Sequence, residues 1–103
     1  MRLGRVLFCA SLLRAADQPQ ANPYAGRPQE IRAGAKLYQR YCAGCHTGGE
    51  KAPALSSGEV RGMSAWELFR LLKDGRLGQG MPSWAQLPPE QRWQIVAWLK
   101  SGD

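Results

Sequence analysis

The sequence lacks the features that mark several large classes of protein. It has one histidine and three cysteines in 103 residues, so a four-ligand zinc site would need every one of them. No apolar run approaches the roughly 20 residues that a membrane-spanning helix needs, and no stretch shows the period of two expected of a β-strand. No internal repeat and no run of lysine or arginine occurs. These absences argue against a membrane-inserted protein, a β-rich fold and a nucleic-acid-binding protein.

The first sixteen residues have the order of an export signal. Arg2 and Arg5 precede a short apolar run, as the charged and apolar regions of a signal peptide do. Ala16 is the expected end of this leader, although Arg14 lies where a small residue is usual, so an unusual leader or a misassigned start is the alternative. Removing residues 1–16 lowers the formal charge from +6 to +3. So mild a charge gives no reason to expect nucleic acid as a partner.

The rest of the chain has room for one domain. Three prolines and few aliphatic residues within 17–28 predict a linker without regular structure. Residues 29–103 then form the domain, at a size where an apolar core is marginal and commonly needs a metal, a cofactor or a disulfide. We therefore expect a covalent or metal-linked support for the fold.

Helical patterns account for most of this domain, so the expected fold class is all-α. The predicted helices cover approximately residues 29–42, 64–75 and 88–101. Ser64 and Glu67 fit a capping box at the start of the second helix, with Met63 and Leu68 as its hydrophobic staple. Between the helices lie two long segments rich in glycine and proline, 47–62 and 76–87. Loops of that length in so small a domain are usually functional or wrapped around something.

The strongest functional signal is Cys42-Ala-Gly-Cys45-His46. Two thiols separated by two residues can add to the two vinyl groups of one haem, and the next histidine is then placed to bind the iron. A thioredoxin-type motif would usually follow a strand, whereas this one closes a predicted helix. A zinc site would have to recruit Cys9 from the leader. A plain disulfide would leave His46 unexplained.

Iron held by His46 on one side needs a second protein ligand or keeps an open position. Met81 is the candidate, because it offers a soft thioether in a glycine-rich loop, expected to be mobile, and is fixed by Pro82. Ligation by histidine and methionine raises the reduction potential and blocks small molecules, which suits electron transfer. Most methionines fill the core, and that is the role expected for Met63.

These residues resemble the class I cytochrome c family over about 31–101. The segment from Gly34 through Tyr38 to the cysteine motif resembles the family's first helix, and the segment around Trp98 resembles its last helix. The resemblance implies a cytochrome c fold in which Gly34 lets the two helices approach closely and Tyr38 packs against Trp98. No role is assignable from the sequence to Tyr24, Trp66, Trp84 and Trp93.

A further part of the resemblance follows the cysteine motif. Pro53-Ala-Leu55 is similar to a Pro-x-Leu segment of the family. By that similarity, the Pro53 carbonyl accepts the Nδ1–H of His46 and leaves Nε2 for iron, while Leu55 covers the haem face. The expected cofactor-binding residues are Cys42, Cys45, His46, Pro53, Leu55 and Met81, with His46 and Met81 as the iron ligands and haem c attached through Cys42 and Cys45.

The resemblance also implies haem attachment outside the bacterial cytoplasm, which together with the leader predicts a periplasmic protein. The expected function is one-electron transfer between a dehydrogenase or membrane complex and a terminal acceptor, by a protein that is not itself an enzyme. The expected partners are redox proteins: a dehydrogenase, an oxidase or another cytochrome. One alternative is a haem c subunit of a larger oxidoreductase, and another is a gas-binding or peroxidase-like protein with an open iron position.

Basic side chains near the haem motif and the methionine loop have two interpretations. They are either a mildly positive rim that steers acidic partners or a scattered solvated surface. The residues concerned are Arg40, Lys51, Lys73 and Arg76.

Overall fold

The computed structural model describes residues 18–46 and 61–101. In chain order the elements of these two ranges are α2 (Pro28–Tyr41), α3 (Ala43–His46), α5 (Ala65–Asp74), the 3₁₀ helix η1 (Leu77–Gln79) and α6 (Pro89–Ser101). The same ranges contain no strand, only an isolated antiparallel bridge between Arg76 and Met81. The all-α prediction is confirmed, and the three long helices begin and end within one or two residues of their predicted limits.

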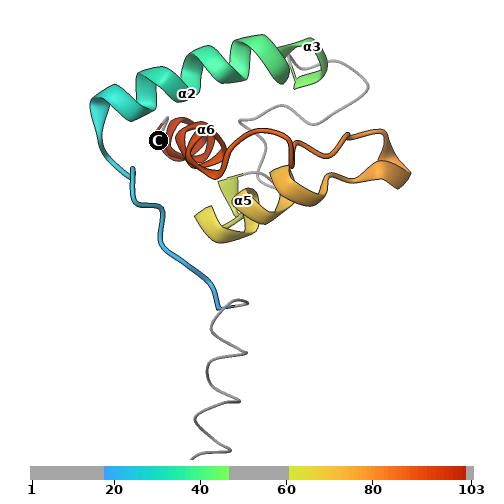
Figure 1. Ribbon diagram of the computed structural model, residues 1–103, viewed down its shortest axis with the longest axis horizontal. Coiled ribbons are helices and arrows are strands. Elements are labelled where there is room, and N and C mark those ends of the chain that lie inside the picture. Colours follow the sequence, from blue (N-terminus) through green and yellow to red (C-terminus); the bar gives the residue numbers. More distant parts are fainter. Residues whose placement is uncertain (1–17, 47–60, 102–103) are drawn as a thin grey trace, which may run out of the picture.

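Helix α6 lies between the other two long helices, and α2 runs across it (Figure 1). The crossing is close because Gly34 has no side chain. A Cβ atom there would collide with the carbonyl oxygen of Gln94 and lie 2.5 Å from its carbonyl carbon. Next to this contact, the rings of Tyr38 and Trp98 pack with their centroids 4.5 Å apart. Both features of the crossing that the resemblance implied are therefore confirmed.

Helix α5 supplies the opposite side of the core. The buried cluster consists of Leu68, Leu72, Leu87, Trp93, Ile95 and Val96. The rings of Phe69 on α5 and Trp93 on α6 stack at 3.9 Å with only 9° between their planes. Aromatic pairs of this kind stabilise by about 0.5–1.5 kcal/mol beyond the apolar area they bury, so this stack is a main link between the two helices.

The start of α5 is formed as its sequence predicts. The Ser64 hydroxyl accepts a hydrogen bond from the Glu67 amide at 3.1 Å, and the Glu67 carboxylate accepts one from the Ser64 amide at 2.8 Å. Met63 packs against the cluster that contains Leu68, as the predicted staple requires. The helix ends at Gly75, whose φ of +71° is strained for a residue with a side chain.

The segment before α2 contributes one buried contact that no sequence pattern indicates. Residues 18–27 contain no helix or strand. Asn22 is nevertheless buried, and its Nδ2 donates to the Trp93 carbonyl of α6 at 3.0 Å. Its Oδ1 accepts from the Tyr24 amide at 2.9 Å. Asn22 therefore fastens the segment before α2 onto the last helix.

Within residues 18–46 and 61–101, no helix is both long enough and apolar enough to cross a lipid bilayer.

Candidate functional site

The cysteine motif lies in one helical turn at the end of α2. The Cys42 amide still donates to the Tyr38 carbonyl at 2.8 Å, and the His46 amide donates to the Cys42 carbonyl at 3.0 Å. Helical residues three and four apart lie on the same face, so the backbone places positions 42, 45 and 46 on one side of this turn. The backbone of one helical turn thus brings positions 42, 45 and 46 close together, as binding to one haem would require.

Tyr38 contacts the same turn from the helix crossing. It is 6% exposed, and its hydroxyl donates to the His46 carbonyl at 3.1 Å. Burial raises the pKa of this phenol above its ordinary value of 10.0, and the nearby Cys42 adds to the rise. Tyr38 therefore stays protonated at neutral pH, as a hydrogen-bond donor must.

The segment that carries Met81 is a closed loop beyond α5. The Arg76 amide donates to the Met81 carbonyl at 2.9 Å, and the Met81 amide donates back to the Arg76 carbonyl at 3.0 Å. The helix η1 fills the turn between them, and Gly80 with φ of +86° reverses the chain. Met81 is half-buried and packs against the core cluster, whereas Leu77 at the turn is 74% exposed.

Hydrogen bonds and close contact hold this loop against the end of α5. The Trp84 amide donates to the Leu72 carbonyl at 2.8 Å, and the Ser83 hydroxyl donates to the Lys73 carbonyl at 2.5 Å. These bonds satisfy carbonyls that the end of a helix leaves without helical partners. A Cβ at Gly75 would lie 2.7 Å from the Pro82 backbone, so the loop also folds tightly on the helix end. Its glycine content predicts a mobile loop, but this bonding ties it to α5 and gives Met81 a defined position.

Arg92 fastens the other end of the loop. Its Nε donates to the Leu87 carbonyl at 3.2 Å, and its guanidinium lies 4.6 Å from the centroid of the Phe69 ring. Burial lowers the pKa of this guanidinium, and the charge of Asp74 opposes that change. The Nη1 atom is buried and has no hydrogen-bond partner among the described residues. No pattern in the chain indicates that an arginine would be buried here.

An aromatic contact brings the two halves of the site together. Tyr41 directly precedes the cysteine motif and Trp84 follows Met81 by three residues, and their ring centroids are 5.2 Å apart. His46 and Met81 are each half-buried. Packing between segments so far apart in sequence puts the cysteine turn and the methionine loop on the same side of the core.

Several predicted residues lie outside the described ranges. These are the leader (1–16), Pro53, Leu55 and Lys51. Cys42, His46 and Met81 are described, as is the backbone of Cys45. Among the described residues, no three histidine, cysteine, aspartate or glutamate side chains gather closely enough to hold a metal ion. The zinc alternative would also need Cys9 and the Cys45 side chain, which lie outside the part of the chain that the structure describes.

A family model described as cytochrome c oxidase, cbb3-type, subunit III matches residues 29–99. The chain belongs to this family. Searches among curated proteins and among solved structures found no match. Membership makes the chain a c-type cytochrome and implies covalently bound haem c with iron. The all-α cytochrome c fold is thereby confirmed, while the narrower resemblance to small class I monohaem proteins stays a prediction.

The residues present in this cytochrome fit haem c. The site offers a pair of cysteine positions, one imidazole and one thioether, which are the groups that c-type cytochromes use to attach haem and ligate its iron. Half-buried apolar side chains from α2 and from the methionine loop pack against the core cluster, among them Leu37, Tyr41, Met81 and Trp84. Apolar surroundings of this kind suit a large, mostly apolar cofactor.

Proposed function

We propose that this cytochrome is an exported one-electron carrier, with haem c attached through Cys42 and Cys45 and with His46 and Met81 as axial ligands. The observation that carries the proposal is the pairing of the two halves of the site. The cysteine turn and the methionine loop come together through Tyr41 and Trp84. Haem c held by these two segments would take a nitrogen donor from His46 and a sulfur donor from Met81.

When bound, haem c supplies the change between ferric and ferrous iron. The protein's own residues hold the nitrogen and sulfur donors of His46 and Met81 in place and exclude water from the site. The hydrogen bonds that anchor the loop to α5 hold the Met81 backbone in one position, so its thioether would stay available as a lasting ligand of the iron. If the iron keeps the same two ligands in both oxidation states, little structural rearrangement accompanies the transfer of an electron. A small rearrangement favours fast electron transfer.

Redox titration of the purified protein tests the proposal. We expect a reversible one-electron change followed in the visible spectrum, and no ready binding of carbon monoxide by the reduced protein at neutral pH. Rapid carbon monoxide binding would instead support the gas-binding or peroxidase-like alternative, because that chemistry needs an open iron position.

The second candidate function is that of a haem c subunit of an oxidase complex. The family match favours this candidate, because the family's description names subunit III of a cbb3-type oxidase. A subunit of such an oxidase would have its redox partners in the same complex. Purification under mild conditions separates the two candidates. A stable free protein supports the carrier, whereas constant copurification with a catalytic subunit supports the oxidase component.

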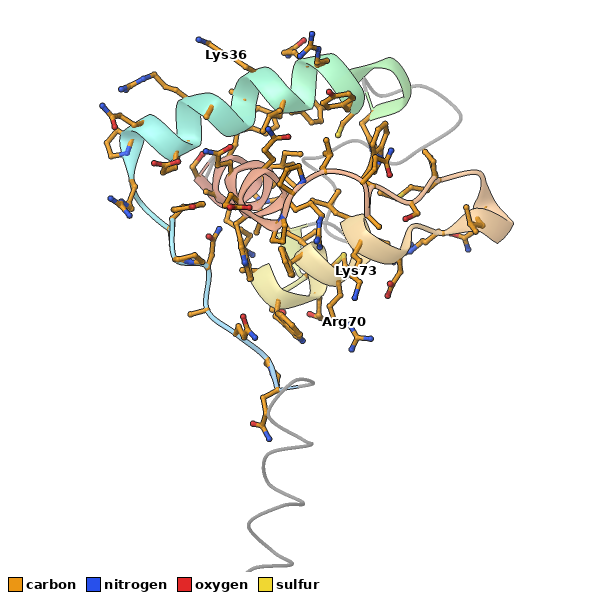
Figure 2. The ribbon with its side chains drawn as sticks, in the orientation of Figure 1. Lys36, Arg70 and Lys73 are labelled. Atoms are coloured by element: carbon orange, nitrogen blue, oxygen red, sulfur yellow. The ribbon has the colours of Figure 1, made fainter. Side chains whose placement is uncertain are left out.

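Periplasmic location and electrostatic steering are further parts of the proposal. Figure 2 shows three exposed cations: Lys36 lies on the outer side of α2, and Arg70 and Lys73 lie on α5, on the opposite side of the molecule. The end of α5 adjoins the methionine loop, since the Ser83 hydroxyl donates to the Lys73 carbonyl. The end of α2 adjoins it too, since Tyr41 packs against Trp84 and the Arg40 guanidinium lies 5.8 Å from the centroid of the Tyr41 ring. The proposed positive rim therefore rests on Arg40, Lys73 and Arg76. Electron-transfer rates that do not change with ionic strength would remove it.

A further inference from the structure

One residue, Tyr38, is hydrogen-bonded to both ends of the cysteine turn. The backbone carbonyl of Tyr38 accepts the Cys42 amide at 2.8 Å, and its hydroxyl donates to the His46 carbonyl at 3.1 Å. The first bond is an ordinary helical bond that any residue could make. The second reaches eight residues along the chain, past the end of α2, and depends on the tyrosine hydroxyl.

Tyr38 is itself fixed by the rest of the protein. Its ring packs against Trp98 of α6 at 4.5 Å, and Gly34, one turn earlier, makes the backbone contact with Gln94. The ring therefore cannot follow the turn if the turn moves. Its hydroxyl is a fixed point to which the His46 carbonyl is bound, and it connects the helix crossing with the residue proposed to ligate iron.

This hydrogen bond is costly to lose. Tyr38 is buried and His46 is half-buried, so water replaces the lost Tyr38 donor only in part. Another bond at this end of the turn runs from the His46 amide to the Cys42 carbonyl at 3.0 Å. It belongs to a helix of four residues, which has little stability of its own.

We infer that Tyr38 is a positioning residue for the haem-binding turn: its hydroxyl holds the backbone of His46 and thereby sets where the imidazole is presented. The inference rests on the proposed function, since it concerns the histidine proposed to bind iron. It assigns a role to a hydroxyl that helix packing alone does not need, because phenylalanine would fill the crossing equally well.

Amide hydrogen exchange in the haem-loaded protein tests this role. In a Tyr38→Phe variant the ring stays in the crossing and only the hydroxyl is lost. We expect exchange of the His46 amide to accelerate about tenfold relative to the Val96 amide in the core of α6, because the turn opens locally. The hyperfine-shifted ring resonances of His46 in the oxidised protein should move as well.

Two variants serve as controls. Tyr41→Phe removes the hydroxyl of the adjacent tyrosine and should change the exchange ratio by less than twofold. Trp98→Phe weakens the crossing without touching the Tyr38 hydroxyl, so it should accelerate both amides by a similar factor. If Tyr38→Phe behaves like either control, the inference is overturned and the proposed function stands. If the wild-type protein carries no covalent haem, the proposed function is overturned and the inference with it.

Discussion

Single residues decide how closely the helices meet, and Gly34 is the clearest case. A methyl group there would overlap the Gln94 carbonyl. Helix propensity alone would favour alanine over glycine by about 1 kcal/mol, but overpacking at a close contact typically costs about 1–3 kcal/mol. The cost of the steric overlap therefore exceeds the gain in helix propensity, and the close crossing of α2 and α6 requires glycine at position 34.

We accordingly predict that Gly34→Ala lowers the free energy of unfolding by about 1–2 kcal/mol, measured by chemical denaturation. Gly78→Ala is the matched control, because a Cβ there meets nothing within 4 Å and should leave stability nearly unchanged. Equal stability of the two variants would show that α2 and α6 do not approach each other as the structure has them.

Met81 and Met63 differ in role although both pack against the core cluster. We predict that Met81→Leu lets the reduced protein bind carbon monoxide at neutral pH, because the leucine side chain fills similar volume without a sulfur donor. Met63→Leu keeps apolar volume at the start of α5 and should leave the protein unreactive. The measurement is the visible spectrum of each reduced variant before and after addition of the gas. If carbon monoxide changes the reduced spectra of both variants equally, or of neither, the assignment of Met81 as an iron ligand is contradicted.

At the scale of elements, α5 is the helix whose local signals are most complete. Its capping box, its staple and its terminal glycine all occur where the sequence predicts them. The hydrogen bonds from Ser64 lower the pKa of Glu67 below its ordinary value of 4.5. A carboxylate with a lowered pKa stabilises the fold at pH values above that ordinary value, and the contribution disappears as the pH falls through the lower, folded-state pKa.

We therefore predict that part of the acid destabilisation of the protein arises from Glu67. A Glu67→Gln variant can still form the capping box but does not titrate. Its thermal midpoint should fall less steeply than that of the wild type as the pH is lowered below about 4.5. Parallel curves for the two proteins would assign the acid sensitivity to other carboxylates.

The elements themselves were predictable from sequence, because caps, glycines and apolar spacing are local signals. The contacts that assemble the site were not. The bond between Trp84 and Leu72, the burial of Asn22 against Trp93, and the Arg92 bond to Leu87 leave no periodic pattern in the chain. The site residues Cys42, Cys45, His46 and Met81 stood out because their chemistry is unusual, and the structure adds how the chain holds two of them, His46 and Met81.

For the whole molecule, the two halves of the site depend on different parts of the core. The cysteine turn is attached to the crossing of α2 and α6 through Tyr38. The methionine loop is attached to α5 by hydrogen bonds and to α6 by Arg92. Because α6 packs against both α2 and α5, it is the common support that sets the position of one half relative to the other.

Covalent attachment of haem through Cys42 and Cys45 is the central claim, and a haem-stained denaturing gel tests it directly. After expression with a working haem-attachment system, we predict that the wild-type band retains haem through denaturation and that a Cys42→Ser, Cys45→Ser variant loses it. A wild-type band without haem, or a stained band from the double variant, would contradict the account.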